Sequence, residues 1–298
     1  MHGWIILDKP VGLGSTQAVS AVKRALRQGG YGKFKVGHGG TLDPLASGVL
    51  PIAVGEATKL AGRMLDSDKI YDFTIRFGEQ TDTLDAEGVA VATSDVRPTR
   101  AALIAVLPRF TGPIDQVPPA YSALKVDGAR AYDRARAGEA VTLATRTVTI
   151  HALDVIDLPD GDQPLDAATL RAHVSKGTYI RSLARDVALA LGTVGHVTML
   201  RRTRAGPFGL DGAISLDKLG EAGMARELEY LLLPLRAGLD DIPALSLDPD
   251  QAGALRQGRI VAGHAADDGL HFAMSGDTPV ALVEVLDGNV QVVRGFNL

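Results

Sequence analysis

The sequence predicts an α+β fold with a second, smaller module at its carboxyl end. Three observations support this prediction. The 298 residues exceed the usual size of one domain. Strand-like and helical patterns follow one another without the strict alternation of a doubly wound sheet. From about residue 240 the chain carries nine acidic and three basic residues, and its predicted elements become short. We therefore divide the chain into residues 1–236 and 237–298.

Hydrophobic periodicity predicts the elements of the larger part in order. Residues 15–27 carry apolar side chains at helical spacing between a Ser/Thr start and Gly29, which predicts a helix. Residues 69–77 alternate, which predicts a strand with Tyr71 on its inward face. Further predicted elements are a helix over 99–107, strands over 145–158 and 170–175, and a helix over 180–191. The proline- and glycine-rich residues 111–141 predict an excursion outside the main sheet.

The smaller part predicts a β-rich module. Asp248 is placed to cap a short helix that Gly258 ends. Residues 280–285 and 290–294 are rich in valine and flank the sequence Leu-Asp-Gly-Asn, which is typical of a β-hairpin.

The composition and the missing motifs exclude several kinds of chemistry. The chain has no cysteine, which excludes a disulfide framework, a thiolate metal site and a cysteine nucleophile. It lacks a phosphate-binding loop, a dinucleotide-binding glycine motif, a zincin helix and a nucleophile elbow. Its seven histidines lack paired metal-ligand spacing. We therefore expect no cofactor and no metal, and a reaction carried out by side chains alone.

The hydropathy pattern indicates a cytoplasmic protein. The first residues have no cationic start and only a short apolar run, unlike a signal peptide. No stretch reaches the length of about 18–20 apolar residues that a membrane helix needs. We expect no membrane partner, and no obligate protein partner is evident.

Charge is distributed unevenly along the chain. The net charge is −4, but residues 1–40 carry six basic residues and one acid, and residues 171–206 carry seven basic residues and one acid. If these two blocks meet in space, they form a face that binds phosphates of a nucleic acid. If they do not meet, they are ordinary solvated surfaces.

The segment 36–51 has the densest group of unusual residues. It holds four glycines, His38 and the pair Asp43-Pro44. Glycines let a backbone approach a ligand closely. Asp43 followed by proline is also the pattern of a helix N-cap with proline in the first turn. From these residues alone, Asp43 is either a structural cap or a functional carboxylate, and His38 is either structural or part of a site.

Seven motifs in order carry a resemblance to a known family. They include Leu-Asp-Lys-Pro-Val-Gly at 7–12, Gly-His-Gly-Gly-Thr-Leu-Asp-Pro-Leu-Ala-Ser-Gly at 37–48 and Gly-Thr-Tyr-Ile-Arg-Ser-Leu-Ala-Arg-Asp at 177–186. The others are at 69–71, 81–88, 117–125 and 200–203. Together they closely resemble the bacterial tRNA pseudouridine synthase B family over about residues 3–210.

The resemblance implies a fold and a reaction. The fold is a mixed, mainly antiparallel sheet flanked by helices, the pseudouridine synthase fold. It would form a catalytic domain over 1–236, with an insertion at about 111–141 that clamps RNA. A small PUA-like module would follow over 237–298. The reaction detaches the T-loop uracil of tRNA from its ribose and rejoins it through C5, after the base is flipped out of the loop. It requires no cofactor or metal.

The resemblance also assigns roles to individual residues. Asp43 is the catalytic carboxylate, Arg181 keeps it ionised, and Tyr71 lies against the uracil. Burial disfavours an ionised carboxylate, and a guanidinium offsets that effect. The other implied contacts are His38, Tyr179 and Leu200 with the substrate nucleotide, and Lys9, Arg201 and Arg202 with phosphates.

Other interpretations remain open at this point. Tyr71 is equally a core tyrosine, and the arginines and Lys9 are equally surface charges. The two basic blocks also suit a non-catalytic RNA-binding or tRNA-folding protein. A hydrolase with a carboxylate nucleophile is disfavoured, because sugar hydrolysis normally needs two carboxylates.

Overall fold

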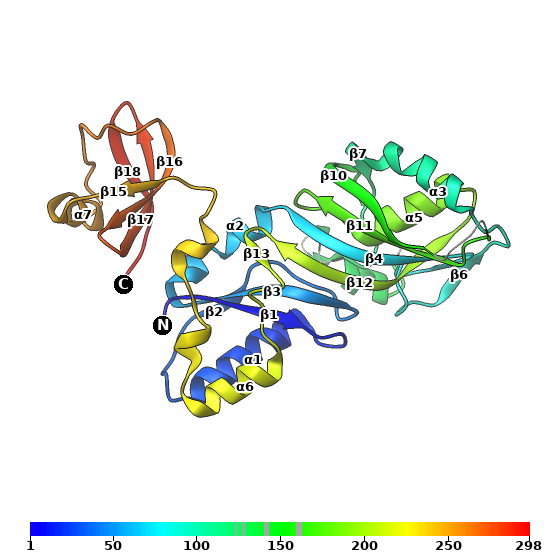
Figure 1. The fold of residues 1–298 in the computed structure, drawn as a ribbon, viewed down its shortest axis with the longest axis horizontal. Helices are drawn as coiled ribbons and strands as arrows, with labels where there is room; N and C mark the ends of the chain where they lie inside the picture. Colours follow the sequence, from blue (N-terminus) through cyan, green and yellow to red (C-terminus); the bar gives the residue numbers. More distant parts are fainter. Residues whose placement is uncertain (123, 127–128, 140–142, 159–162) are drawn as a thin grey trace.

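The computed structural model describes residues 1–298 except 123, 127–128, 140–142 and 159–162. Its largest element is one twisted ten-stranded sheet that runs through the middle of the molecule (Figure 1). In spatial order the strands are β14 (Leu233–Pro234), β1 (Gly3–Lys9), β3 (Ala46–Val54), β12 (Gly195–Ala205), β4 (Lys69–Phe77), β11 (Ala167–Val174), β10 (Arg146–Asp157) and β7 (Gly112–Gln116). β2 (Val36–His38) pairs with β3, and β13 (Phe208–Gly209) pairs with β12.

The sheet is mixed and mainly antiparallel, as predicted. Among its described ladders only β3 and β12 run parallel, with Leu200 opposite Ala46 and Arg202 opposite Gly48. Gly48 has a φ of +101°, and a Cβ there would lie 2.1 Å from the carbonyl oxygen of Arg202. Glycine is therefore required where these two strands meet.

Helices cover the two halves of the sheet separately. α1 (Ser15–Gln28) and α6 (Leu216–Ala225) lie side by side against the β1–β3 half (Figure 1). Their apolar faces share one core with Ile5, Leu50 and Ile52. α3 (Arg100–Val106) and α5 (Ile180–Ala190) pack against the other half, in a core with Phe73 and Leu170. Since α5 begins directly after a turn that leaves β11, its first residues lie close to the middle of the sheet.

The remaining short elements connect these parts. The short helices are α2 (Ala61–Asp66), α4 (Ala131–Arg136), η1 (Gly55–Lys59), η2 (Leu107–Phe110), η3 (Leu228–Leu231) and η4 (Leu235–Gly238). The small strand pairs are β5 (Glu79–Thr81) with β6 (Ala90–Thr93), and β8 (Lys125–Val126) with β9 (Ala129–Arg130). No helix in the described ranges is long and apolar enough to cross a membrane.

The predicted elements agree closely with the structure. The helix predicted over 15–27 is α1, although Gly14 rather than a hydroxyl residue occupies its N-cap position. The strand predicted over 69–77 is β4, with the same bounds. Thr99 caps α3 by accepting a hydrogen bond from the Ala102 N–H at 3.1 Å. Periodicity identified these elements because each buries one face against the core.

The prediction for residues 111–141 is partly wrong. Gly112–Gln116 forms strand β7, which pairs with β10 from Gly112 opposite Ile150 to Gln116 opposite Arg146. This segment therefore completes an edge of the main sheet, and only the residues after it leave the sheet. Proline is tolerated in such an edge strand because one side of the strand has no ladder to complete, which explains why the proline content was misleading.

The carboxyl-terminal residues form a separate four-stranded sheet, visible at one end of the molecule in Figure 1. It consists of β15 (Ala244–Ser246), β16 (Gly269–Ser275), β17 (Thr278–Leu286) and β18 (Asn289–Gly295), with helix α7 (Pro249–Arg256) beside it. The predicted Asp248 cap and the hairpin between β17 and β18 are both present. Phe272 and Phe296 of this module pack into a cluster with Trp4 of β1, which joins the two sheets.

Candidate active site

Asp43 lies in the loop between β2 and β3, at the middle of the sheet. It does not cap a helix, because the next residues form a turn and then β3, with the Ala46 N–H donating to the Asp43 carbonyl at 3.1 Å. Ser15, the first residue of α1, fixes the loop by exchanging two hydrogen bonds with the backbone of Leu42, at 2.8 and 2.9 Å. The helical N-cap interpretation of Asp43 is therefore wrong.

Two buried cationic side chains, Lys9 and Arg202, bind backbone carbonyl oxygens of the Asp43 loop and its neighbours. Lys9 is fully buried, and its ammonium donates to the carbonyl oxygens of Pro10, Leu13 and Pro44 at 3.0, 2.7 and 3.4 Å. Arg202 is 1% exposed and donates to the carbonyl oxygens of Val49, Gly40 and Thr41 at 2.7, 3.1 and 3.4 Å. The phosphate contacts predicted for Lys9 and Arg202 are therefore wrong. Both charges satisfy buried backbone carbonyls on either side of Asp43.

Arg181 makes a direct ion pair with Asp43. Its Nη2 lies 2.9 Å from Oδ2 of Asp43, while its Nη1 lies 3.1 Å from Oδ2 of Asp85. The guanidinium also donates to the carbonyl oxygens of Thr83 and Tyr121 at 2.9 and 3.0 Å. The Arg181 side chain is 7% exposed and that of Asp43 is 41% exposed. The arginine is thus a buried, fixed charge, and the carboxylate it binds is accessible.

Asp85 is a buried carboxylate in the same network, and the sequence did not predict it as a site residue. It is 4% exposed and accepts hydrogen bonds from the Thr83 hydroxyl at 2.6 Å and the Glu87 N–H at 3.0 Å. By pairing with Arg181 it compensates the arginine's charge inside the protein and fixes the orientation of the guanidinium group. The motif at 81–88 contains Asp85, but the motif alone does not show which of its acids turns inward.

A cavity of about 290 Å³ opens above Asp43. The structure brings five of the other predicted site residues into its lining: Tyr71, Tyr179, Arg181, Leu200 and Arg202. Lys69, Ser122 and Thr178 also line it and were not predicted. Tyr71 and Leu200 pack against the cores of both sheet halves, so the cavity lies where the two halves meet.

Three predicted residues are outside the lining of this cavity. Lys9 lies beneath the loop, as described above. His38 is on β2, half-buried, and its Nδ1 has no hydrogen-bond partner among the described residues. Arg201 makes a bidentate ion pair with Asp8, at 3.0 and 2.8 Å, and its side chain is 35% exposed.

Three basic groups around the Asp43 loop have lowered pKa values. Burial lowers the pKa of Lys9 to about 8, against the attraction of Asp43. Burial, followed by repulsion from Arg202, lowers the pKa of Lys69 to about 8. Burial and then Arg202 also lower the pKa of His38, which favours its neutral form. Lys9 of the first basic block and Arg181 and Arg202 of the second thus come together around Asp43, and all three side chains are buried. The other five basic residues of the first block are exposed.

Two family models match most of the chain. Residues 23–180 match the model described as TruB family pseudouridylate synthase, N-terminal domain, and residues 181–240 match the tRNA pseudouridylate synthase B C-terminal domain. The chain belongs to the TruB family of pseudouridylate synthases. As a TruB-family protein it is an enzyme that isomerises uridine to pseudouridine in tRNA. The alternative of a non-catalytic RNA-binding or tRNA-folding protein gains no support.

Relatives of this TruB-family chain match it along its whole length. It is 67% identical to the tRNA pseudouridine synthase B of Novosphingobium aromaticivorans, over 100% of this chain and 98% of the relative. It is 60% identical to that of Zymomonas mobilis, over 100% of this chain and 96% of the relative.

Two solved structures share the fold. One is described as the structure of an H/ACA RNP bound to a substrate RNA containing 2'-deoxyuridine, with a TM-score of 0.74 and 26% identity over 99% of this chain and 85% of that chain. The other is a Cbf5-Nop10-Gar1 complex, also with a TM-score of 0.74, with 28% identity and the same coverage.

Proposed function

We propose that this enzyme acts on the uridine of the tRNA T loop, that the cavity above Asp43 receives the flipped nucleotide, and that Asp43 is the catalytic carboxylate. The observation that carries the proposal is the ion pair between the accessible Asp43 and the buried Arg181, 2.9 Å apart. This pair holds an accessible carboxylate next to a fixed positive charge in the lining of the cavity.

The isomerisation needs no atoms from outside the substrate. The bond between ribose C1' and N1 of uracil breaks, the base turns, and a bond forms between C1' and C5. The proton on C5 leaves, and N1 gains a proton. Asp43 serves as the nucleophile or base that separates base from sugar. The Tyr71 ring would lie against the uracil, and its hydroxyl would handle the C5 proton.

Arg181 supports this reaction by position and charge. A carboxylate in a poorly solvated cavity tends to take up a proton, and an adjacent guanidinium opposes that tendency. Because Asp85 and two backbone carbonyls also hold Arg181, the arginine does not need to move when substrate displaces water from the cavity. The preorganised ion pair therefore holds the Asp43 carboxylate in position for the first step of the reaction.

Flipping the nucleotide costs a few kcal/mol of lost stacking, which protein groups must replace. Stacking of one base on an aromatic ring contributes about 1–3 kcal/mol. We assign this role to Tyr71 in the cavity and to His38 beside it, with Tyr179 and Leu200 completing the pocket for the nucleotide. Arg201 retains exposed surface and is assigned a phosphate contact.

Recognition of the T arm by residues after β7 is part of the same proposal. The start of this segment is anchored to α5, where Ser182 donates to the Val117 carbonyl at 2.8 Å and Arg181 donates to that of Tyr121. The segment to residue 141 would clamp the RNA against the cavity. The module at 237–298 would be PUA-like, but its acidic surface makes it a weak phosphate binder. We place the enzyme in the cytoplasm with its tRNA.

The experiment is release of tritium from tRNA transcripts labelled at uridine C5. We expect the wild-type enzyme to release label in proportion to pseudouridine formed, and a transcript with cytidine at the T-loop target to release none. Asp43→Asn should reduce the single-turnover rate by at least about a thousandfold, as loss of a nucleophile does. Unreduced release by Asp43→Asn would refute the catalytic assignment. Release from the cytidine transcript would refute the T-loop target.

A further inference from the structure

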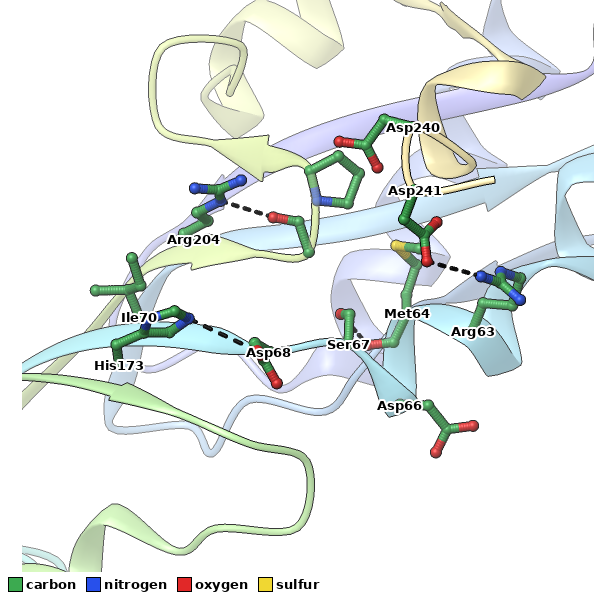
Figure 2. Close-up of a pocket in the computed structure, with 12 residues that line it drawn as sticks. Arg63, Met64, Asp66, Ser67, Asp68, Ile70, His173, Arg204, Asp240 and Asp241 are labelled. Carbon is green, nitrogen blue, oxygen red and sulfur yellow. Dashed lines mark hydrogen bonds and ion pairs between the residues drawn. The ribbon is translucent and has the colours of Figure 1, made fainter. Parts of the chain in front are cut away.

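A second concave region lies away from the Asp43 cavity, at the start of β4. This cavity has a volume of about 530 Å³ and is shown in Figure 2. Its lining includes two arginines and four aspartates: Arg63, Arg204, Asp66, Asp68, Asp240 and Asp241. Arg63 is already ion-paired with Asp241 at 2.9 Å. Because carboxylates outnumber cations, the cavity disfavours a phosphate group and favours a cation.

Two imidazoles share one carboxylate oxygen at the edge of this cavity. Oδ2 of Asp68 lies 3.1 Å from Nε2 of His151 and 3.8 Å from Nε2 of His173. The two imidazole rings are 4.7 Å apart between centroids. All three donor atoms lie within 4.8 Å of one another. Figure 2 shows the His173 ring directed at Asp68, just before β4.

The local fold brings this cluster together from strands β10 and β11 and from the residue that precedes β4. Ile150 of β10 pairs with Val174 and Ala152 pairs with His173, so His151 is the extra residue of a β-bulge. A bulge re-aims the side chain of the unpaired residue. Ile70 of β4 pairs with His173 of β11, and Asp68, two residues earlier, lies on the same face as Ile70. The bulge and the register together place two imidazoles and a carboxylate at one point.

We propose that Asp68, His151 and His173 bind a divalent transition metal ion of the Zn²⁺ type. Zinc binds histidine nitrogen at about 2.0–2.1 Å and carboxylate oxygen at about 2.0–2.2 Å, so tetrahedral donors lie about 3.4 Å apart. The distances of 3.1 and 3.8 Å bracket that value. Imidazole suits zinc, cobalt and nickel, whereas magnesium and calcium prefer oxygen ligands only. Three protein ligands leave a fourth position for water on the cavity side.

The bound metal would link three strands of the sheet. Lys69 and Tyr71 follow Asp68 on β4 and line the Asp43 cavity. A metal on Asp68 would therefore restrain the start of the strand that carries Tyr71. The metal proposal stands on the cluster alone and does not depend on the proposed reaction at Asp43.

The test uses the full-length, untagged protein after treatment with a chelator. We expect one equivalent of Zn²⁺ to bind in a calorimetric titration and to raise the melting temperature. Cobalt(II) should give the visible absorption bands of a site with nitrogen ligands. Millimolar Mg²⁺ should not compete.

Three single variants and one matched control locate the site. Asp68→Asn, His151→Asn and His173→Asn should each weaken Zn²⁺ binding by at least about tenfold. Loss of a residue that only hydrogen-bonds to a metal ligand already lowers metal affinity by about 10–100-fold. His264→Asn, in the carboxyl-terminal module, should bind zinc as the wild type does. All three ligands are at least partly exposed, so the variants should keep the melting temperature of the metal-free wild type. The proposal is overturned if wild type shows no saturable binding, or if binding survives all three substitutions.

Discussion

Asp43 and Asp68 make an instructive comparison, because both precede strands of the same sheet. Asp43 is held by a guanidinium that is itself buried among two carboxylates and two carbonyls. Asp68 is exposed and faces two imidazoles. The first arrangement fixes a charged oxygen for chemistry, and the second suits a metal ion that comes from solvent. The surroundings of each carboxylate, rather than its position before a strand, decide what it can do.

The largest contrast in stability should come from two arginine–aspartate pairs. Arg181 is 7% exposed in its pair with Asp43 and Asp85, whereas Arg171 is 49% exposed in its bidentate pair with Asp72. Arg181→Met should lower the free energy of unfolding by about 3–5 kcal/mol, because it leaves Asp85 buried and uncompensated. Arg171→Met should lower it by about 1 kcal/mol or less.

Urea unfolding of both variants measures this contrast. Arg181→Lys provides a milder variant that retains a positive charge but has no guanidinium to bind both carboxylates at once. This variant should still lose most of the tritium release. Equal losses of stability in Arg181→Met and Arg171→Met would contradict the account of a buried charge network.

The next prediction separates the buried Arg202 from its neighbour Arg201. Arg202→Met should lower the free energy of unfolding by at least about 1–3 kcal/mol, the cost of an unsatisfied buried carbonyl group. It should leave the salt dependence of tRNA binding unchanged. Arg201→Met should reduce the slope of log Kd against log salt by about 1, as loss of one phosphate contact does. Filter binding at several salt concentrations measures the slope for both variants. A reduced slope in Arg202→Met would show that Arg202 contacts a phosphate after all.

A pH-dependent prediction compares buried Lys9 with exposed Lys33. The pKa of Lys9 is about 8 in the folded protein, against 10.5 for an ordinary, solvent-exposed lysine. Between these values the unfolded chain binds the proton and the folded protein does not, so Lys9 makes stability rise with pH from about 8 to about 10.5. Below about pH 8 both states are protonated, and the contribution is constant.

Unfolding by urea at pH 7 to 10.5 measures this effect as the difference between wild type and variant. Lys9→Met should remove part of the rise in stability, and Lys33→Met should not. An identical pH profile for wild type and Lys9→Met would show that the ammonium is hydrated rather than buried.

The smallest expected effect lies in the carboxyl-terminal module. Asp248 caps α7 by accepting from the Gln251 N–H at 2.7 Å, and the Gln251 side chain bonds back to the Asp248 N–H. Asp248→Ala should cost about 1 kcal/mol and leave the rate of tritium release unchanged. A loss of rate comparable to that of a cavity variant would mean that this module takes part in the reaction.

Much of this structure could be predicted from the sequence, and the exceptions have two physical causes. Alternation and helical spacing located β4, α1 and α5, because each element buries one face. The motifs placed Asp43 and Arg181 in one site. Lys9 and Arg202 were wrongly predicted to contact phosphates. The identity of a basic residue in a motif does not show whether its side chain reaches a phosphate or a buried carbonyl oxygen.

Two further features depend on pairing that the sequence does not show. Residues 112–116 contain proline and were placed outside the sheet, yet β7 needs only one partner, the strand β10. His151 and His173 have no metal-binding spacing along the chain, and only the bulge in β10 brings them together. Both depend on strand register, which is set by tertiary contacts.

The most direct test of the central claim is a crystal structure of the enzyme with a T-arm stem-loop that carries 5-fluorouridine at the target position. We expect this nucleotide to be extruded into the cavity, with the Asp43 carboxylate at the sugar or ring and Tyr71 against the base. The ion pair between Arg181 and Asp43 should be retained. A target base that stays stacked in its loop, or that binds away from Asp43, would contradict this claim.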